Sequence, residues 1–145
     1  MIDILDRIAN RLAEISPETN VYVENQRSGF NVPAFYVNRV STEINPRLNG
    51  IQDRHFNFQI VYFPNPDNPN VDMNRMEDLL SDNFLELEEF ATIRNREFNT
   101  DTEEQTLSMQ FEIWLNMMPE EFKQKQEVIK LGKVGLKDRN NNQNS

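Results

Sequence analysis

The chain has 145 residues, of which 37% are hydrophobic, with no cysteine and a formal net charge of −9 at pH 7. This length fits one domain that buries most of a single core. The lack of cysteine excludes disulfides, zinc–thiolate sites and cysteine nucleophiles. No run approaches the roughly 20 apolar residues of a membrane-spanning helix, and residues 1–6 show no secretory signal pattern. We therefore expect the protein to be made and used in a cytoplasm, or in an assembly formed there.

The charge is distributed unevenly along the chain. Residues 1–118, the body, hold nine basic and twenty acidic side chains, whereas residues 119–145, the C-terminal segment, hold six basic and four acidic ones. All five lysines lie in the C-terminal segment. Nucleic-acid binders instead carry a basic patch on the folded domain. The pattern predicts a body that repels DNA, with a tail that either binds an acidic partner or is simply solvated.

The first half of the chain predicts one helix followed by a long β-hairpin. Apolar residues at helical spacing indicate an amphipathic helix over residues 2–15. A short strand follows at residues 21–24, then a strand over 33–44, a turn over 45–50 and a strong alternating strand over 52–63. The hairpin tip, residues 42–53, is too polar to belong to the core.

The second half predicts a covering helix and the remaining strands. A helix is expected over residues 71–89, a weak strand over 92–99 and a central strand over 107–117, where apolar and polar residues alternate without a break. The predicted fold class is α+β: a largely antiparallel or mixed sheet with a long β-hairpin, covered by two amphipathic helices. We expect the body to be one domain and the C-terminal segment to be an extended tail ordered by a partner subunit.

The residues that most resemble catalytic groups are better explained structurally. His55 is the only histidine, and no serine or cysteine lies near it in the sequence. A catalytic histidine needs both a partner and a cleft, so a polar strand position is favoured over a catalytic one. Four acids lie on the second helix, where a divalent metal would relieve their repulsion, but no histidine or calcium-loop pattern completes a shell. A solvated acidic face is therefore favoured for Asp72, Glu77, Asp78 and Asp82. We predict no enzymatic activity, no cofactor and no metal.

Two further features leave alternatives open. Glu86, Glu88 and Glu89 close the predicted second helix, where the macrodipole disfavours negative charge. Either the helix ends earlier or these acids face a basic partner. Trp114 lies on the polar face of the last strand, where it either packs under the second helix or anchors an interface.

Three groups of residues are candidates for an interface. Trp114 is the first, and the polar hairpin tip is the second. The third is the stretch 127–137, which mixes lysines with apolar residues and has the composition to add a strand to a neighbour's sheet edge. The individual candidates are Trp114; Asn45, Arg47, Leu48, Asn49 and Ile51; and Val128, Ile129, Lys130, Leu131, Lys133 and Val134.

Two short motifs resemble those of a known family. They are Gln26-x-x-Gly29-Phe30-x-x-Pro33-x-Phe35 and the strand end Phe58-x-Ile60-x-Tyr62-Phe63-Pro64. Over residues 2–118 the chain is similar to the tail terminator family of tailed phages and prophages. The resemblance implies a virion protein that forms a ring, six-fold in related proteins, and caps the finished tail tube. Its implied partners are copies of itself, the tail tube protein and a head-completion protein, with DNA passing through the lumen and no catalytic residues.

Other classes of protein share parts of this pattern. Another head–tail connector or head-closure subunit of the same virion is the nearest alternative. A metal-dependent hydrolase would use the acids of the second helix, and a monomeric chaperone or adaptor would be acidic but would not form closed rings.

Overall fold

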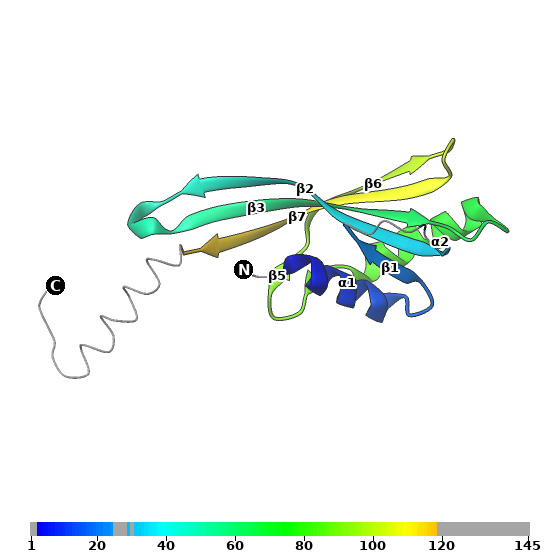
Figure 1. The fold of residues 1–145 in the computed structure, drawn as a ribbon, viewed down its shortest axis with the longest axis horizontal. Helices are drawn as coiled ribbons and strands as arrows, with labels where there is room; N and C mark the ends of the chain where they lie inside the picture. Colours follow the sequence, from blue (N-terminus) through cyan, green and yellow to red (C-terminus); the bar gives the residue numbers. More distant parts are fainter. Residues whose placement is uncertain (1–2, 25–28, 30, 119–145) are drawn as a thin grey trace, which may run out of the picture. The chain divides into compact units, whose positions relative to one another are not determined.

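A five-stranded sheet, in the order β1-β2-β3-β7-β6, organises the chain (Figure 1). In the computed structural model, which describes residues 3–24, 29 and 31–118, β1 runs parallel to β2 and β6 runs antiparallel to β7. The described residues divide into two compact units, those within 3–43 and 55–115 and those within 44–54 and 116–118. The sheet strands are β1 (Asn20–Val23), β2 (Ala34–Pro46), β3 (Gln52–Phe63), β6 (Arg94–Asp101) and β7 (Thr106–Met117).

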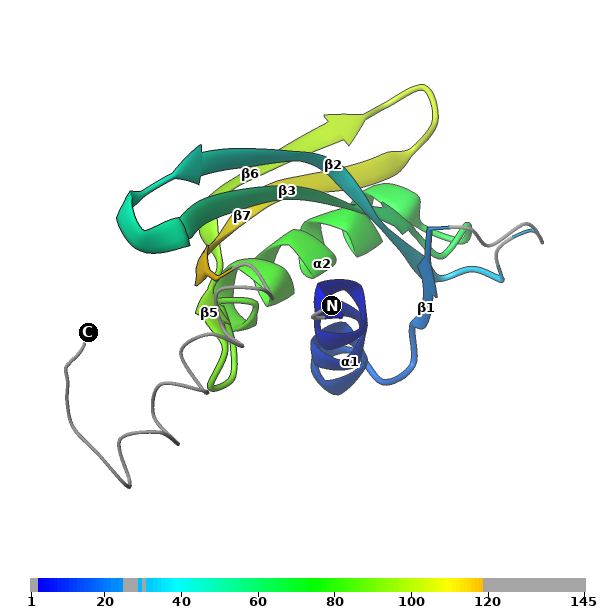
Figure 2. The same ribbon diagram turned by 60° about the vertical axis from the view of Figure 1, so that its left-hand side comes forward.

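In the described part of the chain, helices cover one face of the sheet and leave the other face open. Both α1 (Ile4–Ile15) and α2 (Pro69–Asn83) lie on the same side of it (Figure 2). Alternate residues of β3 and β7 are buried, as expected when one face of a strand meets the core. These core residues are Phe56, Phe58, Ile60 and Tyr62 of β3, and Leu107, Met109, Phe111 and Ile113 of β7.

This architecture confirms the predicted α+β class with a mixed sheet, two helices and a long hairpin. The strand predicted over residues 52–63 coincides with β3. β2 continues to Pro46, beyond the predicted end at residue 44, before a single 3-10 turn, η1 (Leu48–Gly50). The predicted tail at 119–145 lies outside the described residues, so this tail and the domain boundary after residue 118 stay predictions. Within the described ranges, no helix is long and apolar enough to cross a membrane.

The predicted end of the second helix is wrong. α2 ends at Asn83, and a small hairpin of β4 (Glu86–Leu87) and β5 (Ala91–Thr92) follows. The glutamates at 86, 88 and 89 therefore lie outside the helix, so the alternative in which the helix ends early is correct. The weak strand expected at 92–99 is likewise divided between β5 and β6.

Two arginines from other elements cap the C-terminal end of α2. One guanidinium nitrogen of Arg96, on β6, lies 3.3, 3.0 and 3.3 Å from the carbonyl oxygens of Leu80, Ser81 and Phe84. Arg11, on α1, donates to the carbonyl of Asn83 at 3.1 Å. Helix carbonyls at this end carry partial negative charge and are short of backbone partners, although that of Leu80 also accepts from the Phe84 N–H at 2.9 Å. The arginines supply both partners and positive charge, which fixes where α2 stops.

Asp72 holds the N-terminal end of α2 against the end of β3. Its Oδ2 accepts hydrogen bonds from the Tyr62 hydroxyl at 2.5 Å and from the Asn65 N–H at 2.9 Å. Its Oδ1 accepts two from the Arg75 guanidinium, at 3.1 and 2.9 Å. Burial alone would raise the pKa of Asp72, but these hydrogen bonds outweigh burial and lower it, while burial and the same contact raise the pKa of Tyr62. Asp72 is therefore a structural residue.

Replacing Asp72 with Asn tests this role. We expect the free energy of unfolding to fall by about 1 to 3 kcal/mol at neutral pH, because charge-assisted hydrogen bonds to a largely buried group are lost. Since the folded-state pKa lies below the ordinary value of 3.8, the contribution is complete well above pH 3.8 and disappears as the pH falls through the folded-state pKa. Urea unfolding of both proteins across this pH range measures the difference. Asp78→Asn, at an exposed position of the same helix, is the control. A difference that does not change with pH would contradict the role given to Asp72.

Candidate interaction surface on the open face of the sheet

Trp114 lies at the centre of a row of side chains that crosses the open face of the sheet. Its ring stacks on His55 of β3, with centroids 4.4 Å apart and planes at 11°. The Arg94 guanidinium of β6 lies 4.4 Å from the Trp114 ring centroid. On the far side of His55, Nδ1 lies 4.0 Å from a carboxylate oxygen of Glu43, on β2. The row therefore spans four strands, in the order Glu43, His55, Trp114, Arg94.

The structure decides between the two alternatives for the location of Trp114. Its side chain is 40% exposed, and its indole N–H donates to Glu112, two residues earlier on the same strand, at 2.7 Å. It does not pack under α2, and the interpretation of Trp114 as a buried residue is wrong. Stacking and cation–π contacts hold the ring in one position although much of it faces solvent. Its part in an interface stays a prediction.

A β-bulge in β6 places Arg94 on this face. Arg94 pairs with Glu112 and Glu97 with Gln110, so two residues of β6 oppose one residue of β7. The extra residue is accommodated by Asn95, whose φ is 54°. Asn is among the non-glycine residues that enter this left-handed region most readily. As a result Arg94 contacts Trp114, whereas Arg96 reaches α2 on the opposite face.

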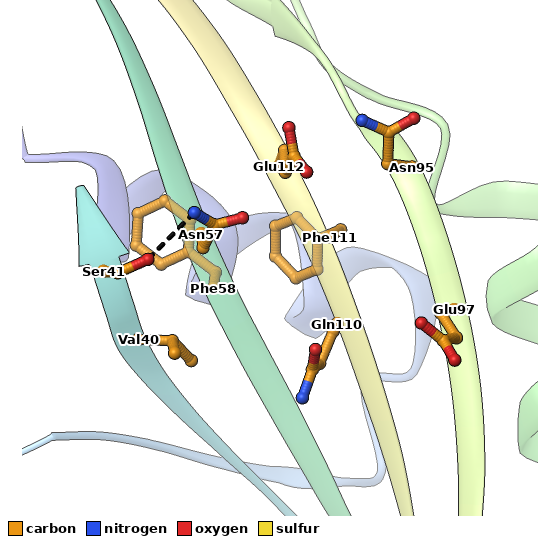
Figure 3. Close-up of a pocket in the computed structure, with 9 residues that line it drawn as sticks. All are labelled: Val40, Ser41, Asn57, Phe58, Asn95, Glu97, Gln110, Phe111 and Glu112. Atoms are coloured by element: carbon orange, nitrogen blue, oxygen red, sulfur yellow. Dashed lines mark hydrogen bonds between the residues drawn. The ribbon is translucent and has the colours of Figure 1, made fainter. Parts of the chain in front are cut away.

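Beside the Trp114 row lies a shallow polar pocket of about 260 Å³. Figure 3 shows side chains from β2, β3, β6 and β7 around it, with the Asn57 amide donating to the Ser41 hydroxyl at 2.9 Å. Two carboxylates, Glu97 and Glu112, give it a negative side. The complete lining is Val40, Ser41, Asn57, Phe58, Asn95, Glu97, Gln110, Phe111 and Glu112. The pocket suits amides and cations, but it holds no nucleophile–base pair.

The hairpin tip belongs mainly to the second compact unit. Its turn is fixed by an ion pair between Arg47 and Asp53 at 2.7 Å and by a hydrogen bond from the Arg47 N–H to the Ile51 carbonyl at 2.7 Å. Asn49 and Gly50 take positive φ angles of 65° and 77° to close it. Leu48 is 85% exposed, and Asn45 is exposed while Ile51 is half-buried. An apolar side chain is thus presented on an ordered turn.

The structure places some of the remaining residues that the sequence offered as catalytic, metal-binding or interface candidates, and others lie outside the described residues. His55 is held by Trp114, as described above. Among residues 3–24, 29 and 31–118, no group of three histidine, aspartate or glutamate side chains is placed to hold a metal ion. Val128, Ile129, Lys130, Leu131, Lys133 and Val134 lie outside the described residues.

Sequence reasoning missed the contacts of His55, Arg94 and Glu112 with Trp114, since these depend on strand pairing. The one local signal was Asn95, a residue type that enters the left-handed region readily, inside the strand predicted over residues 92–99.

Comparison with known proteins identifies the family. The family model described as "Phage tail terminator protein" matches residues 3–126, most of the chain. The chain matches no curated protein. It therefore belongs to the phage tail terminator family, whose members are structural proteins of the virion tail and interact with other tail components. This confirms the resemblance drawn from the two sequence motifs.

Replacing Trp114 with Ala measures how much the contacts of its side chain contribute to the free energy of unfolding. We expect the free energy of unfolding to fall by about 1 to 2 kcal/mol, the sum of one stacking and one cation–π contact. A tryptophan in the core would cost about 3 to 5 kcal/mol. Urea unfolding measures the change, and Leu48→Ala, at the exposed tip, should stay within about 0.5 kcal/mol of the parent protein. A fall in the free energy of unfolding of about 3 to 5 kcal/mol would mean that Trp114 supports the fold rather than presenting a surface.

Proposed function

We propose that this phage tail terminator protein forms a closed ring, most simply of six subunits, at the head-proximal end of the tail. The ring caps the tail tube, ends its polymerisation and offers a surface to a head-completion protein. The observation that carries the proposal is the family match over residues 3–126, together with a sheet face that presents Trp114 and that no helix of the described residues covers. The protein acts in the virion tail, and in the host cytoplasm during assembly.

The Trp114 row has the properties of an interface centre. Tryptophan and arginine are enriched among the residues that dominate binding energy. Because His55 and Arg94 already hold the ring, little side-chain freedom is lost when a partner covers it. The neighbouring carboxylates of Glu97 and Glu112 give the surface a polar rim. A ring needs two different surfaces on each subunit, since heterologous contacts close when the rotation between copies fits. We assign one of these surfaces to the Trp114 row.

The hairpin tip provides a second contact, to the tube or to the head-completion protein. Leu48 projects from a turn that Arg47 and Asp53 lock in place. A fixed, exposed leucine fits an apolar pocket on a partner at low entropic cost. We propose that Asn45, Arg47, Asn49 and Ile51 form the polar surroundings of this contact.

The charge of the body supports passage of DNA without binding. Nine basic against twenty acidic side chains give residues 1–118 a balance of −11. Such a surface repels phosphates, whereas DNA-binding surfaces attract them. We therefore propose a structural protein without catalysis, cofactor or resident metal.

Complementation of a phage that lacks this protein tests the role of the Trp114 row. When the phage is supplied with the Trp114→Ala protein, its lysates should contain tails that exceed the normal length, because the cap no longer closes on the tube. Trp114→Phe, which preserves a stacking ring, should restore most of the normal length distribution. Val71→Ala, another exposed apolar position outside the surface, is the control. Tail lengths are measured by electron microscopy. Tails of normal length that fail to join heads would instead indicate a connector or head-closure subunit.

Leu48→Glu tests the tip. We expect the stability of the isolated protein to stay unchanged, because the side chain at position 48 is already in solvent. The number of infectious particles should fall at least about ten-fold, because burying a charge in an apolar contact costs more than about 1.4 kcal/mol. Leu48→Met, which keeps an apolar side chain, is the matched control. Equal titres of infectious particles for Leu48→Glu and Leu48→Met would mean that the hairpin tip is not part of an interface.

A further inference from the structure

The sheet has an open edge at β6. β6 is the last strand in the sheet order, with β7 on one side and no strand on the other in the part of the chain that the structure describes (Figure 1). From Glu97 to Asp101 its pairing with β7 is regular, without a bulge. Neither proline nor lysine interrupts this stretch. Natural edge strands usually carry such residues to prevent unwanted pairing. Its carboxylates at Glu97 and Asp101 discourage pairing with another acidic strand, but not with a strand of opposite charge.

The surroundings of this edge are acidic. Exposed carboxylates occur at Glu97 and Asp101 on the strand and at Glu103 and Glu104 on the following turn. That turn is fixed, because Asp101 Oδ1 accepts hydrogen bonds from the N–H groups of both glutamates at 3.0 Å. The nearby arginines are already engaged, Arg96 by the end of α2 and Arg94 by Trp114. Two such edges repel each other, so the edge selects a strand that carries positive charge.

One segment of the chain has that chemistry. Residues 127–137, Glu-Val-Ile-Lys-Leu-Gly-Lys-Val-Gly-Leu-Lys, hold three lysines, one glutamate and five branched apolar side chains. Its balance of three positive against one negative charge is opposite to that of the β6 edge. Three of these, Val128, Ile129 and Val134, are β-branched, the type of apolar residue that is favoured in strands. Neither of its two glycines forbids an edge pairing.

We propose that the β6 edge, from Glu97 to Asp101, binds residues 127–137 of a second copy of this chain as an added strand. Main-chain hydrogen bonds to β6 supply affinity, and lysines opposite the carboxylates supply selectivity and register. The proposal rests on the ring of the proposed function. In such a ring each subunit donates one surface and accepts with another, and a tail docked on the next subunit's edge satisfies this requirement.

Disulfide trapping tests the proposal in the full-length protein, which has no native cysteine. One variant carries Asn99→Cys, at an exposed position of β6 on the same face as Glu97. A second set carries single cysteines at each position from 128 to 134. The Asn99→Cys protein is mixed with each of them under mild oxidation, and linked peptides are identified by mass spectrometry. Asp78→Cys on α2 replaces Asn99→Cys in the control mixtures.

We expect disulfides between different chains at every second position of the scan, the period of a strand. Their yield should exceed that of the Asp78→Cys control and fall about five-fold in 1 M salt, where the lysine–carboxylate attraction is screened over about 3 Å. Yields equal to the control would overturn the proposal. So would Asn99→Cys linking mainly to itself through paired β6 edges.

Failure of this inference can be separated from failure of the proposed function. Charge reversal at Lys130 and Lys133 to Glu should abolish trapping, and addition of Glu97→Lys should recover part of it. Tail length in complemented lysates is scored on the same variants. Normal tails without trapping would reject the β6 contact and leave the terminator role intact. Normal lengths for the Trp114 variants as well would reject the assigned ring surface.

Discussion

The β-bulge at Asn95 is the constraint on which both faces of the sheet depend. In a regular strand Arg94 and Arg96 would point to the same side. The bulge sends Arg96 to the carbonyls that end α2 and Arg94 to the ring of Trp114. A left-handed backbone at a non-glycine residue costs on the order of 1 to 2 kcal/mol. Charge-assisted hydrogen bonds of about 1.5 to 3 kcal/mol from Arg96 offset this cost.

The same constraint explains how the sheet exposes a tryptophan without leaving it mobile. A large ring on an open sheet face is normally a liability, since exposed apolar area promotes unspecific association. Here His55 and Arg94 stack on the ring from the two neighbouring strands, and Glu112 satisfies its N–H. What remains exposed is a limited area in a fixed orientation. That is the form in which an aromatic side chain contributes most to a specific contact.

The sequence predicted what is decided locally and missed what is decided at long range. Alternation in β3 and β7 is a local signal, and both strands were placed within one residue. The end of α2 was not predicted correctly, because apolar residues continue at helical spacing through Leu87. The helix ends earlier because Arg96 and Arg11, from other elements, bind its last carbonyls. The polar face carrying Trp114 was recognised from its strand period. Its neighbours required the pairing of three strands and a bulge, which no single stretch of sequence encodes.

The division between arginine and lysine follows from what each side chain does. Arg11 and Arg96 bind helix carbonyls, Arg75 binds a carboxylate and Arg94 lies on an aromatic ring. These contacts use the planar, multidentate guanidinium, which a lysine does not reproduce. Because these arginines are engaged within the fold, the acids dominate what the body presents to solvent. Lysine, a strongly hydrated point charge on a flexible stem, is suited to attraction across a solvated interface. Its restriction to residues 119–145 therefore gives one end of the chain a charge that the body's own surface attracts.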